Sequence, residues 1–275
     1  MKKVAFIGTG NMGGALIQAA CRAVGPEEVV MTDYIREKAS ALAQELGCSA
    51  VDTNDQAVAE AQYIFLCVKP QVLPGVAAGL VPALARCRKA GEEKVLVSIA
   101  AGIQISTLKG YLQGLDPLPP VVRIMPNTCA AIGQGMLAMA AGPEVGAPCL
   151  AEVEQILARA GRVERLEEHL MDQFTAVAGC GPAYVYQFIE ALADGGVLVG
   201  LPRQQAQIYA AQTVLGAAAM VLESGQHPGA LKDAVCSPGG STIAGVAALE
   251  RCAIRSAAIQ AVEAAYRKNL DLGKT

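Results

Sequence analysis

Short apolar runs alternate with amphipathic stretches through the first half of the chain, and glycine or proline follows most of these runs. The alternation predicts strands joined by helices, which is typical of a parallel sheet with right-handed crossover connections. The expected strands are residues 4–7, 28–33, 63–68, 94–99 and 121–125, completed by later strands near 136–140 and 162–166.

The pattern changes near Glu167, after which no strand is expected. Long helices are predicted at residues 172–200, 203–224 and 251–272, and Pro182 must kink or restart the first of them. The stretch 210–222 is apolar on nearly every face, so it needs burial on all sides. A helical segment of about 110 residues cannot easily provide that burial alone.

A glycine motif follows the first predicted strand directly. Residues 8–13 read G-x-G-x-x-G, and a periodic, helix-like stretch comes next. This context is the fingerprint of a dinucleotide site: Gly8 makes the tight turn, Gly10 lets the backbone approach the pyrophosphate, and Gly13 lets the helix lie close to the strand. The alternative is a glycine turn with a structural role only.

These patterns predict an α/β protein with two domains. Residues 1–166 are expected to form an N-terminal Rossmann-type parallel-sheet domain that binds a dinucleotide. Residues 167–275 are expected to form an all-helical C-terminal domain for substrate binding and dimerisation. We expect this second domain to bury itself against another copy of the chain, in a homodimer or a higher homo-oligomer.

Asp33 ends the second predicted strand, twenty positions beyond Gly13. A carboxylate at this place accepts hydrogen bonds from the adenosine ribose, which favours NAD, and it repels the 2′-phosphate of NADP unless a cation compensates. Arg36 and Lys38 are close enough in sequence to do so, and the choice between NADH and NADPH stays open. Asp33 is also a candidate N-cap for a helix at residues 35–47.

Residues just past the carboxyl ends of parallel strands face the ligand in a doubly wound sheet. Lys69 follows the strand 63–68 and is placed to touch a ribose or a phosphate, although a solvated lysine is the alternative. The small residues 100–102 follow the strand 94–99 and leave room for a flat ring.

Composition narrows the possible chemistry. Nine cysteines without a C-x-x-C pair indicate reduced, structural thiols, and they fit neither a disulfide framework nor a zinc site. His169 and His227 are the only histidines, too few for a His-rich metal centre or an obvious Ser-His-Asp triad. We therefore expect no metal, and chemistry that depends on a cofactor.

Charge and hydropathy bear on partners and location. The net charge is −3 and basic residues do not cluster, so no nucleic-acid partner is expected. The chain has no apolar run of membrane-spanning length, and its first residues lead straight into a strand-like segment. The simplest interpretation is a cytoplasmic protein with no membrane partner.

A compact loop at residues 236–242 forms the second candidate site. Pro238 fixes one backbone φ angle, the two glycines after it permit close approach, and Ser241 or Thr242 can cap the helix that follows. Free backbone N–H groups and the helix dipole there suit a small carboxylate. An ordinary capped turn is the alternative.

Motifs along the whole chain resemble those of pyrroline-5-carboxylate reductases, in matching order. They read FIGTGNMG at 6–13, VKP at 68–70, SIAAG at 98–102, MPNT at 125–128, GPAY at 181–184 and EALADG at 190–195, with residues 227–242 the most specific to the family. Cys129 stands where the family usually has proline, and Cys180 where it usually has serine. Both replacements are small, so we expect altered local rigidity or hydrogen bonding without loss of activity.

The resemblance implies reduction of 1-pyrroline-5-carboxylate to L-proline, the last step of proline biosynthesis, by hydride transfer from NADPH or NADH to the C=N carbon. The positions that match the family's dinucleotide contacts are Ile7, Gly8, Thr9, Gly10, Asn11, Met12, Asn54, Cys67, Val68, Lys69, Pro70, Ile99, Ala100 and Ala101. To these, the glycine motif and the second strand add Gly13 and Asp33. Ser241 and Thr242 match substrate-contacting positions.

The loop itself suggests the same roles. Backbone N–H groups and hydroxyls of Ser237, Gly239, Gly240 and Ser241 are expected to bind the substrate carboxylate, while Thr242, the candidate catalytic residue, hydrogen-bonds near the ring nitrogen. Because an imine can enter already protonated, no strongly acidic or basic side chain is required. Thr242 would therefore act to position the substrate more than to donate a proton.

Two other functions share part of this pattern. A β-hydroxyacid dehydrogenase uses a lysine proton donor on the long helix after the sheet domain, and residues 172–200 contain no lysine. A dimeric sensor that binds NAD(P) without turnover would have no need for the serine and threonine of the loop. The sequence leaves open the number of subunits above two and feedback inhibition by proline.

Overall fold

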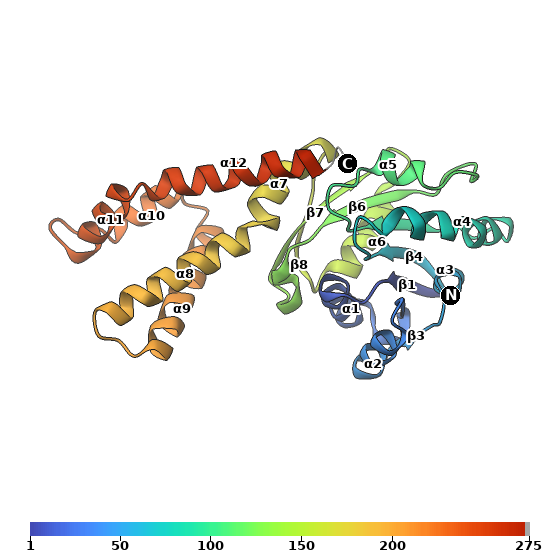
Figure 1. Ribbon diagram of the computed structural model, residues 1–275, viewed down its shortest axis with the longest axis horizontal. Helices are drawn as coiled ribbons and strands as arrows, with labels where there is room; N and C mark the ends of the chain where they lie inside the picture. The colour runs from blue at the N-terminus through green and yellow to red at the C-terminus, as the bar shows by residue number, and fades with distance from the viewer. Residues whose placement is uncertain (273–275) are drawn as a thin grey trace. The chain divides into compact units, whose positions relative to one another are not determined.

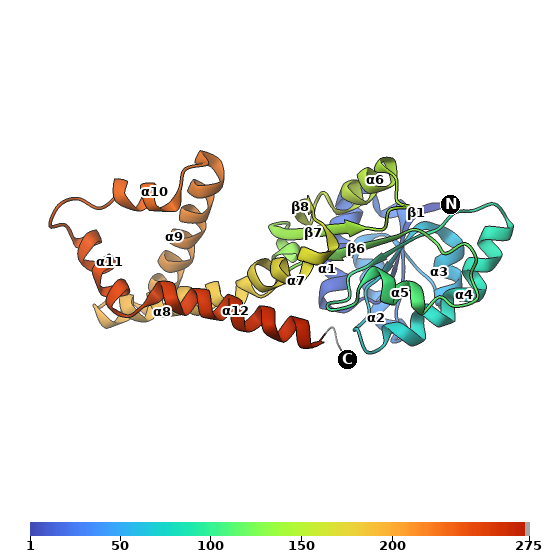
Figure 2. The same cartoon turned by 90° about the horizontal axis from the view of Figure 1, so that it is seen from above.

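A computed structural model describes residues 1–272 of the chain. They form two compact units, which we call the sheet unit (Met1–Cys180 with the chain from Tyr266 onward) and the helical unit (Gly181–Ala265). Figures 1 and 2 show the elements of each. Among the described residues, no helix combines the length and the apolar character needed to cross a membrane.

The sheet unit is built on eight strands in the order β3-β2-β1-β4-β5-β6-β7-β8. The strands are β1 (Lys2–Ile7), β2 (Val29–Thr32), β3 (Ser49–Ala50), β4 (Ala61–Leu66), β5 (Val95–Ser98), β6 (Val121–Met125), β7 (Gly135–Ala141) and β8 (Gly161–Arg165). Across the sheet, the strand numbers fall from β3 to β1 and then rise from β4 to β8. The chain therefore changes its direction of winding at β1, as in a doubly wound Rossmann sheet. The predicted fold class is therefore confirmed, although the two-residue strand β3 was not predicted.

One pair of strands departs from the predicted parallel arrangement. β7 runs antiparallel to β6, whereas every other neighbouring pair in the sheet is parallel. Residues 126–134 connect the two strands, and a parallel return needs a crossover of about a dozen residues or more. The short connection leaves only the antiparallel pairing.

Helices cover both faces of the sheet. They are α1 (Asn11–Val24), α2 (Arg36–Leu46), α3 (Asn54–Glu60), α4 (Leu73–Lys89), α5 (Ile105–Gly110), α6 (Ala147–Leu157) and the single turn α7 (Met171–Phe174), with 3-10 turns at η1 (Pro26–Glu28), η2 (Thr128–Ile132) and η3 (Glu168–Leu170). Successive strand residues alternate between two cores: Val4 and Phe6 belong to one, Ala5 and Ile7 to the other. A sheet buried on both faces explains why the strands are continuous apolar runs.

The chain leaves the sheet unit through irregular helix. After α7, residues Thr175–Gly179 form a π-helical turn, η4, and α8 (Gly181–Leu198) starts on the far side of Cys180. The predicted helix 172–200 is thus broken next to Pro182, as its sequence required. The predicted helix 251–272 starts later, at Ile254, because Ala253 takes a positive φ of 55° and ends the helix before it.

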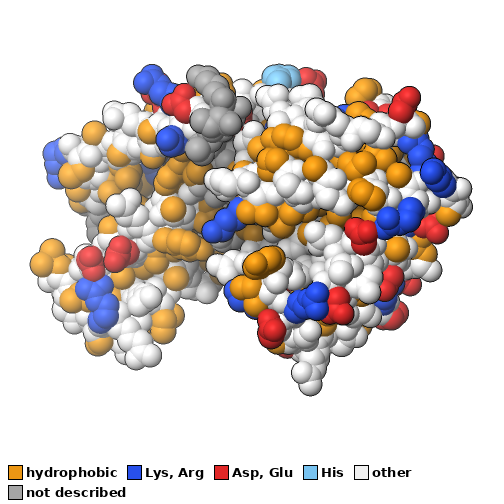
Figure 3. Space-filling model, turned by 45° about the vertical axis from the view of Figure 1, so that its right-hand side comes forward, with side chains coloured by type: hydrophobic (Ala, Val, Ile, Leu, Met, Phe, Trp, Pro, Cys, Tyr) orange, Lys and Arg blue, Asp and Glu red, His pale blue; other side chains and the backbone are white. Residues whose placement is uncertain are grey.

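The helical unit contains α8, α9 (Arg203–Ser224), α10 (Pro228–Ala234), α11 (Ser241–Arg251) and the first part of α12 (Ile254–Leu272). Its buried core is small: Ala193 of α8 packs with Ala206 and Ala210 of α9. Many large apolar side chains remain exposed instead, and Leu198 is 87% exposed. On the face drawn in Figure 3, apolar side chains reach the surface at many points.

Candidate active site

The glycine-rich turn between β1 and α1 depends on its backbone geometry. Gly8 has a φ of 105°, and a Cβ there would lie 2.6 Å from the Cys67 carbonyl oxygen. The Gly8 N–H donates to Thr32 at 2.8 Å, and the Cys67 N–H donates to Ile7 at 2.8 Å, so the ends of β1, β2 and β4 are hydrogen-bonded together. Only glycine allows the turn at this position.

Gly10 and Gly13 have different surroundings, as the dinucleotide fingerprint requires. A Cβ on Gly13 would overlap the Gly8 carbonyl oxygen and lie 3.1 Å from the Cys67 Cβ, so this glycine lets α1 lie against the strand ends. A Cβ on Gly10 would meet no described atom within 4 Å. Gly10 therefore faces open space at the start of α1, where a pyrophosphate can approach the backbone.

Asp33 lies beside this turn and is hydrogen-bonded to it. Its Oδ2 accepts from the Thr9 N–H at 2.6 Å and from the Thr9 hydroxyl at 2.9 Å, while Oδ1 accepts from the Ile35 N–H at 2.9 Å. Partial burial raises the pKa of the Asp33 carboxyl, but these hydrogen bonds and the charge of Lys38 outweigh it, so the pKa lies below its ordinary value of 3.8. The carboxylate is ionised at neutral pH.

The alternative role considered for Asp33, as N-cap of the following helix, is not the one observed. Helix α2 begins at Arg36, and its N-cap residue is Ile35. The Asp33 side chain instead connects the end of β2 to the glycine-rich turn. Of the two neighbouring cations, Arg36 lies 3.7 Å from Asp52 through Nη1, as an exposed ion pair.

The other predicted cofactor residues lie at the same edge of the sheet. Asn54 opens α3 behind Thr53, which caps that helix in a capping box with Gln56. The group from Cys67 to Pro70 follows β4, and the group from Ile99 to Ala101 follows β5. Because β1, β2, β4 and β5 are parallel, their carboxyl ends meet at one edge. The structure thus brings the predicted cofactor residues that follow these four strands to one edge of the sheet.

The residues of this set differ in exposure, in protonation and in hydrogen bonding. Lys69 is exposed, which fits either a contact to phosphate or a solvated lysine. Burial raises the pKa of the Cys67 thiol, so Cys67 is protonated at neutral pH and is not a nucleophile. Ala100 is 4% exposed and its N–H donates to the Ser98 hydroxyl at 3.3 Å, which fixes the start of the loop after β5.

The predicted substrate-binding residues lie in the helical unit, in the loop between α10 and α11. The Gly240 N–H donates to the Ser237 carbonyl at 3.1 Å, and Gly239 has a φ of 69°. This hydrogen bond closes a four-residue turn. A turn with proline at its second position and a positive-φ glycine at its third is typical of type II. The turn presents the first residues of α11 at the surface.

Neither Ser241 nor Thr242 takes the capping role that was considered for them. Gly240 is the N-cap residue of α11, and Ser241 and Thr242 are the first two residues of the helix, both exposed. Among the described residues, no side-chain hydrogen bond caps α11, so neither hydroxyl serves as a cap. They therefore remain available to a ligand, together with the first-turn N–H groups.

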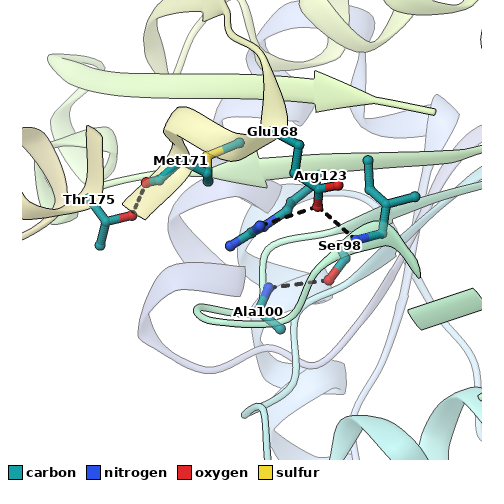
Figure 4. A network of polar contacts seen from close by, with 7 residues as sticks. Ser98, Ala100, Arg123, Glu168, Met171 and Thr175 are labelled. Atoms are coloured by element: carbon teal, nitrogen blue, oxygen red, sulfur yellow. Dashed lines mark hydrogen bonds and ion pairs between the residues drawn. The ribbon is translucent and has the colours of Figure 1, made fainter. Parts of the chain in front are cut away.

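Two features near the candidate site were not predicted from the sequence. Arg123 of β6 is 4% exposed and pairs with Glu168 of η3, as Figure 4 shows. Asn127, after β6, donates to the Ala178 carbonyl at 2.9 Å and accepts from the Met136 N–H at 3.3 Å, which connects two strand ends to the π-helical turn. A charged residue inside an apolar strand was a visible signal for Arg123, and Asn127 lies in the motif MPNT at 125–128, whereas Glu168 carried no signal.

Taken together, the doubly wound sheet and the glycine cradle at its carboxyl edge define a Rossmann-type dinucleotide-binding protein with a helical second part. A family model described as pyrroline-5-carboxylate reductase dimerisation matches residues 168–272, and one described as NADP oxidoreductase, coenzyme F420-dependent, matches residues 3–102. A pyrroline-5-carboxylate reductase of Synechocystis sp. is 42% identical over 275 residues, 99% of this chain and 98% of that protein. The chain belongs to the pyrroline-5-carboxylate reductase family.

Solved structures agree with this assignment. The pyrroline carboxylate reductase of Plasmodium falciparum, crystallised with NADP bound, is 31% identical, covers 99% of this chain and 98% of its own, and superposes with a TM-score of 0.85. The pyrroline-5-carboxylate reductase of Coxiella burnetii is 28% identical, covers 100% of this chain and 99% of its own, and has a TM-score of 0.89. Both units of the chain are therefore shared with these relatives.

Proposed function

We propose that this chain reduces 1-pyrroline-5-carboxylate to L-proline with NADPH or NADH as the reductant. The observation that carries the proposal is similarity to pyrroline-5-carboxylate reductases over 99% of the chain, with the glycine cradle intact. A bound reduced nicotinamide supplies the hydride for the C=N carbon of the substrate. The protein's own part is to bind and orient two small rings.

The cofactor is held along the carboxyl edge of the sheet. The backbone from Ile7 to Gly13 and the open first turn of α1 receive the pyrophosphate, and Asp33 lies where the adenosine ribose binds. The adjacent strand ends contribute the rest of the cradle, namely Asn54, Cys67, Val68, Lys69, Pro70, Ile99, Ala100 and Ala101. Open space beside Gly10 and the small residues after β5 support this placement.

The substrate is held by the loop before α11. Ser237, Gly239, Gly240 and Ser241 offer N–H groups and hydroxyls to its carboxylate, and the Thr242 hydroxyl hydrogen-bonds near the ring nitrogen. The exposure of Ser241 and Thr242, and their freedom from capping, support these roles. No titrating side chain needs to move a proton if the imine enters protonated.

The chain acts as a homodimer or a higher homo-oligomer, with residues 1–166 serving the cofactor and residues 167–275 serving substrate and dimerisation. The match of residues 168–272 to a dimerisation model and the many exposed apolar side chains of the helical unit support this division. We place the protein in the cytoplasm, since all nine of its cysteines are free thiols, which suits a reducing compartment.

The test is the loss of reduced-nicotinamide absorbance when purified protein receives 1-pyrroline-5-carboxylate, run with NADPH and with NADH and against controls without substrate. We expect substrate-dependent oxidation, with L-proline formed in equal amount. Cofactor binding without oxidation would favour a sensor instead, and oxidation dependent on a β-hydroxyacid or its ketone would favour a dehydrogenase.

A further inference from the structure

Arg123 is a buried cation in the middle of the sheet unit. It lies on β6, opposite Ser98 of β5 in the strand register, and its side chain is 5% exposed. A charged group that leaves water needs a close partner of opposite charge. That partner is Glu168, whose Oε1 lies 3.2 Å from the Arg123 Nη1.

The same carboxylate oxygen has a second partner in a different element. Glu168 Oε1 accepts a hydrogen bond from the backbone N–H of Ile105 at 2.7 Å. Ile105 is the first residue of α5, so its N–H has no acceptor within its own helix. Glu168, distant in sequence, provides that acceptor, and Arg123 holds Glu168 in place to do so.

These contacts fix the loop between β5 and α5 at both ends. At its start, the Ser98 hydroxyl accepts from the Ala100 N–H at 3.3 Å; at its end, Glu168 holds Ile105. Figure 4 shows Ser98 and Ala100 near the ion pair of Arg123 and Glu168. Between these anchors lie Ile99, Ala100 and Ala101, the part of the loop that the proposed function assigns to the cofactor.

Glu168 also belongs to the segment that leads out of the sheet unit. It begins the 3-10 turn η3, and the stretch matched by the dimerisation model starts at the same residue. The next turn is well packed: Met171 is fully buried, and its carbonyl accepts from the Thr175 hydroxyl at 2.7 Å. The loop after β5 is therefore tied to this packed segment as well as to the sheet.

We propose that Arg123 and Glu168 form a positioning pair, which holds the loop of residues 99–104 in the conformation that binds the reduced nicotinamide cofactor. The inference rests on the proposed function, because it takes that loop as a cofactor contact. Neither residue touches the reacting atoms. Their effect passes through the Ile105 backbone and appears as cofactor affinity.

The experiment compares Glu168→Ala, Glu168→Gln and the control Glu167→Gln with the wild-type protein. The alanine variant removes both interactions of the carboxylate. The glutamine variant keeps an acceptor for the Ile105 N–H but removes the charge opposite Arg123. Glu167 is the matched control, because it is the neighbouring glutamate, its side chain is 80% exposed, and it pairs with His169 at the surface.

Three quantities are measured: the KM and kcat for NADPH and NADH, the cofactor Kd without substrate, and amide hydrogen exchange over residues 100–105. We expect Glu168→Ala to raise both the cofactor KM and Kd about tenfold and to speed exchange at Ile105, with the KM for pyrroline-5-carboxylate little changed. Glu168→Gln is expected to lie between the alanine variant and wild type. Glu167→Gln should match wild type in all three.

The outcomes separate this inference from the proposed function. If wild-type protein does not oxidise NAD(P)H with pyrroline-5-carboxylate, the proposed function fails, and this inference falls with it. If wild type is active but both Glu168 variants keep its cofactor KM and Kd, only the positioning pair is overturned, even where their melting temperature falls. Should the alanine variant not fold, the glutamine variant decides the matter by the same cofactor measurements.

Discussion

The Asp33 carboxylate receives two hydrogen bonds from a single residue, Thr9, through its backbone N–H at 2.6 Å and its hydroxyl at 2.9 Å. This contact links the end of β2 to the turn that carries the dinucleotide fingerprint. It also keeps the carboxylate ionised, because the pKa of Asp33 lies below its ordinary value. A fixed negative charge therefore stands where the adenosine ribose of the cofactor is expected.

Replacing Asp33 with serine should shift cofactor preference toward NADPH. The carboxylate repels a 2′-phosphate, and its removal leaves the positive charges of Arg36 and Lys38 to favour that group. We expect Asp33→Ser to raise the ratio of kcat/KM for NADPH to kcat/KM for NADH about tenfold or more, a change worth about 1.4 kcal/mol. Arg36→Ala is the converse variant and should lower the ratio. An unchanged ratio in Asp33→Ser would show that Asp33 does not select the cofactor.

The same contact predicts a pH dependence of stability. A carboxyl whose pKa is lower in the folded state stabilises the fold above its unfolded pKa, and the contribution is lost as the pH falls through the folded pKa. The difference in unfolding free energy between wild type and Asp33→Asn should stay constant from pH 8 to about 5 and shrink below about pH 4. Urea unfolding at several pH values measures it, with Glu45→Gln, on an exposed part of α2, as the control. A difference that already shrinks between pH 8 and 6 would contradict this.

Two glycines of one motif should respond differently to alanine. At Gly13 an added Cβ would overlap the Gly8 carbonyl, so Gly13→Ala should lower the free energy of unfolding by about 1–3 kcal/mol, although alanine normally favours a helix. At Gly10 an added Cβ meets open space among the described residues. Gly10→Ala should therefore cost less than about 1 kcal/mol of stability while weakening cofactor binding about tenfold. Thermal unfolding and cofactor titration of both variants measure the contrast.

Much of the geometry at the candidate cofactor site was predictable because its signals are local. The turn at Gly8, the acid at Asp33 and the small residues after β5 each directly follow an apolar strand, and parallel strands bring such endings to one edge. The short helix α10 was not predicted, but the break before α8 and the bounds of α9 followed in the same way from Pro182 and from the helical pattern of residues 203–224. These features need no knowledge of distant neighbours.

The remaining features depend on contacts between distant residues. Thr9 and Asp33, or Arg123 and Glu168, are far apart in sequence, and no local pattern pairs them. Helix α2 begins only at Arg36, three residues past Asp33, so Ile35 is its N-cap residue and the Asp33 carboxylate accepts from the Thr9 and Ile35 N–H groups instead. The antiparallel β7 likewise follows from the length of one connection, which alternating strands and helices do not reveal.

A single substitution on α9 should separate the oligomer into monomers. Ile208, Leu215 and Leu222 recur every seven residues and are 58%, 59% and 73% exposed, so they form an apolar stripe along one face of α9. The opposite face is used within the unit, since Ala206 and Ala210 pack against α8. Leu215→Glu would place a charge at the middle of the stripe and should give a monomer by light scattering, where wild type gives at least a dimer.

The control for this test is Gln44→Glu, which adds the same charge to an exposed position of α2 in the sheet unit. It should leave the oligomer unchanged. A Leu215→Glu protein with the wild-type mass would remove this stripe from the proposed interface.

Thr242 provides the most direct test of the substrate loop. Its hydroxyl is exposed at the second position of α11 and takes no part in capping, so Thr242→Ala should leave the fold and the cofactor Kd intact. Loss of a hydrogen bond to a charged imine should lower kcat/KM for pyrroline-5-carboxylate about 10- to 100-fold. Thr242→Ser keeps the hydroxyl and should retain most of the activity. Equal activity of wild type and Thr242→Ala would place the ring nitrogen elsewhere.

Ser241→Ala, by contrast, should mainly raise the substrate KM. A group that holds the carboxylate equally in the ground and transition states contributes to binding alone.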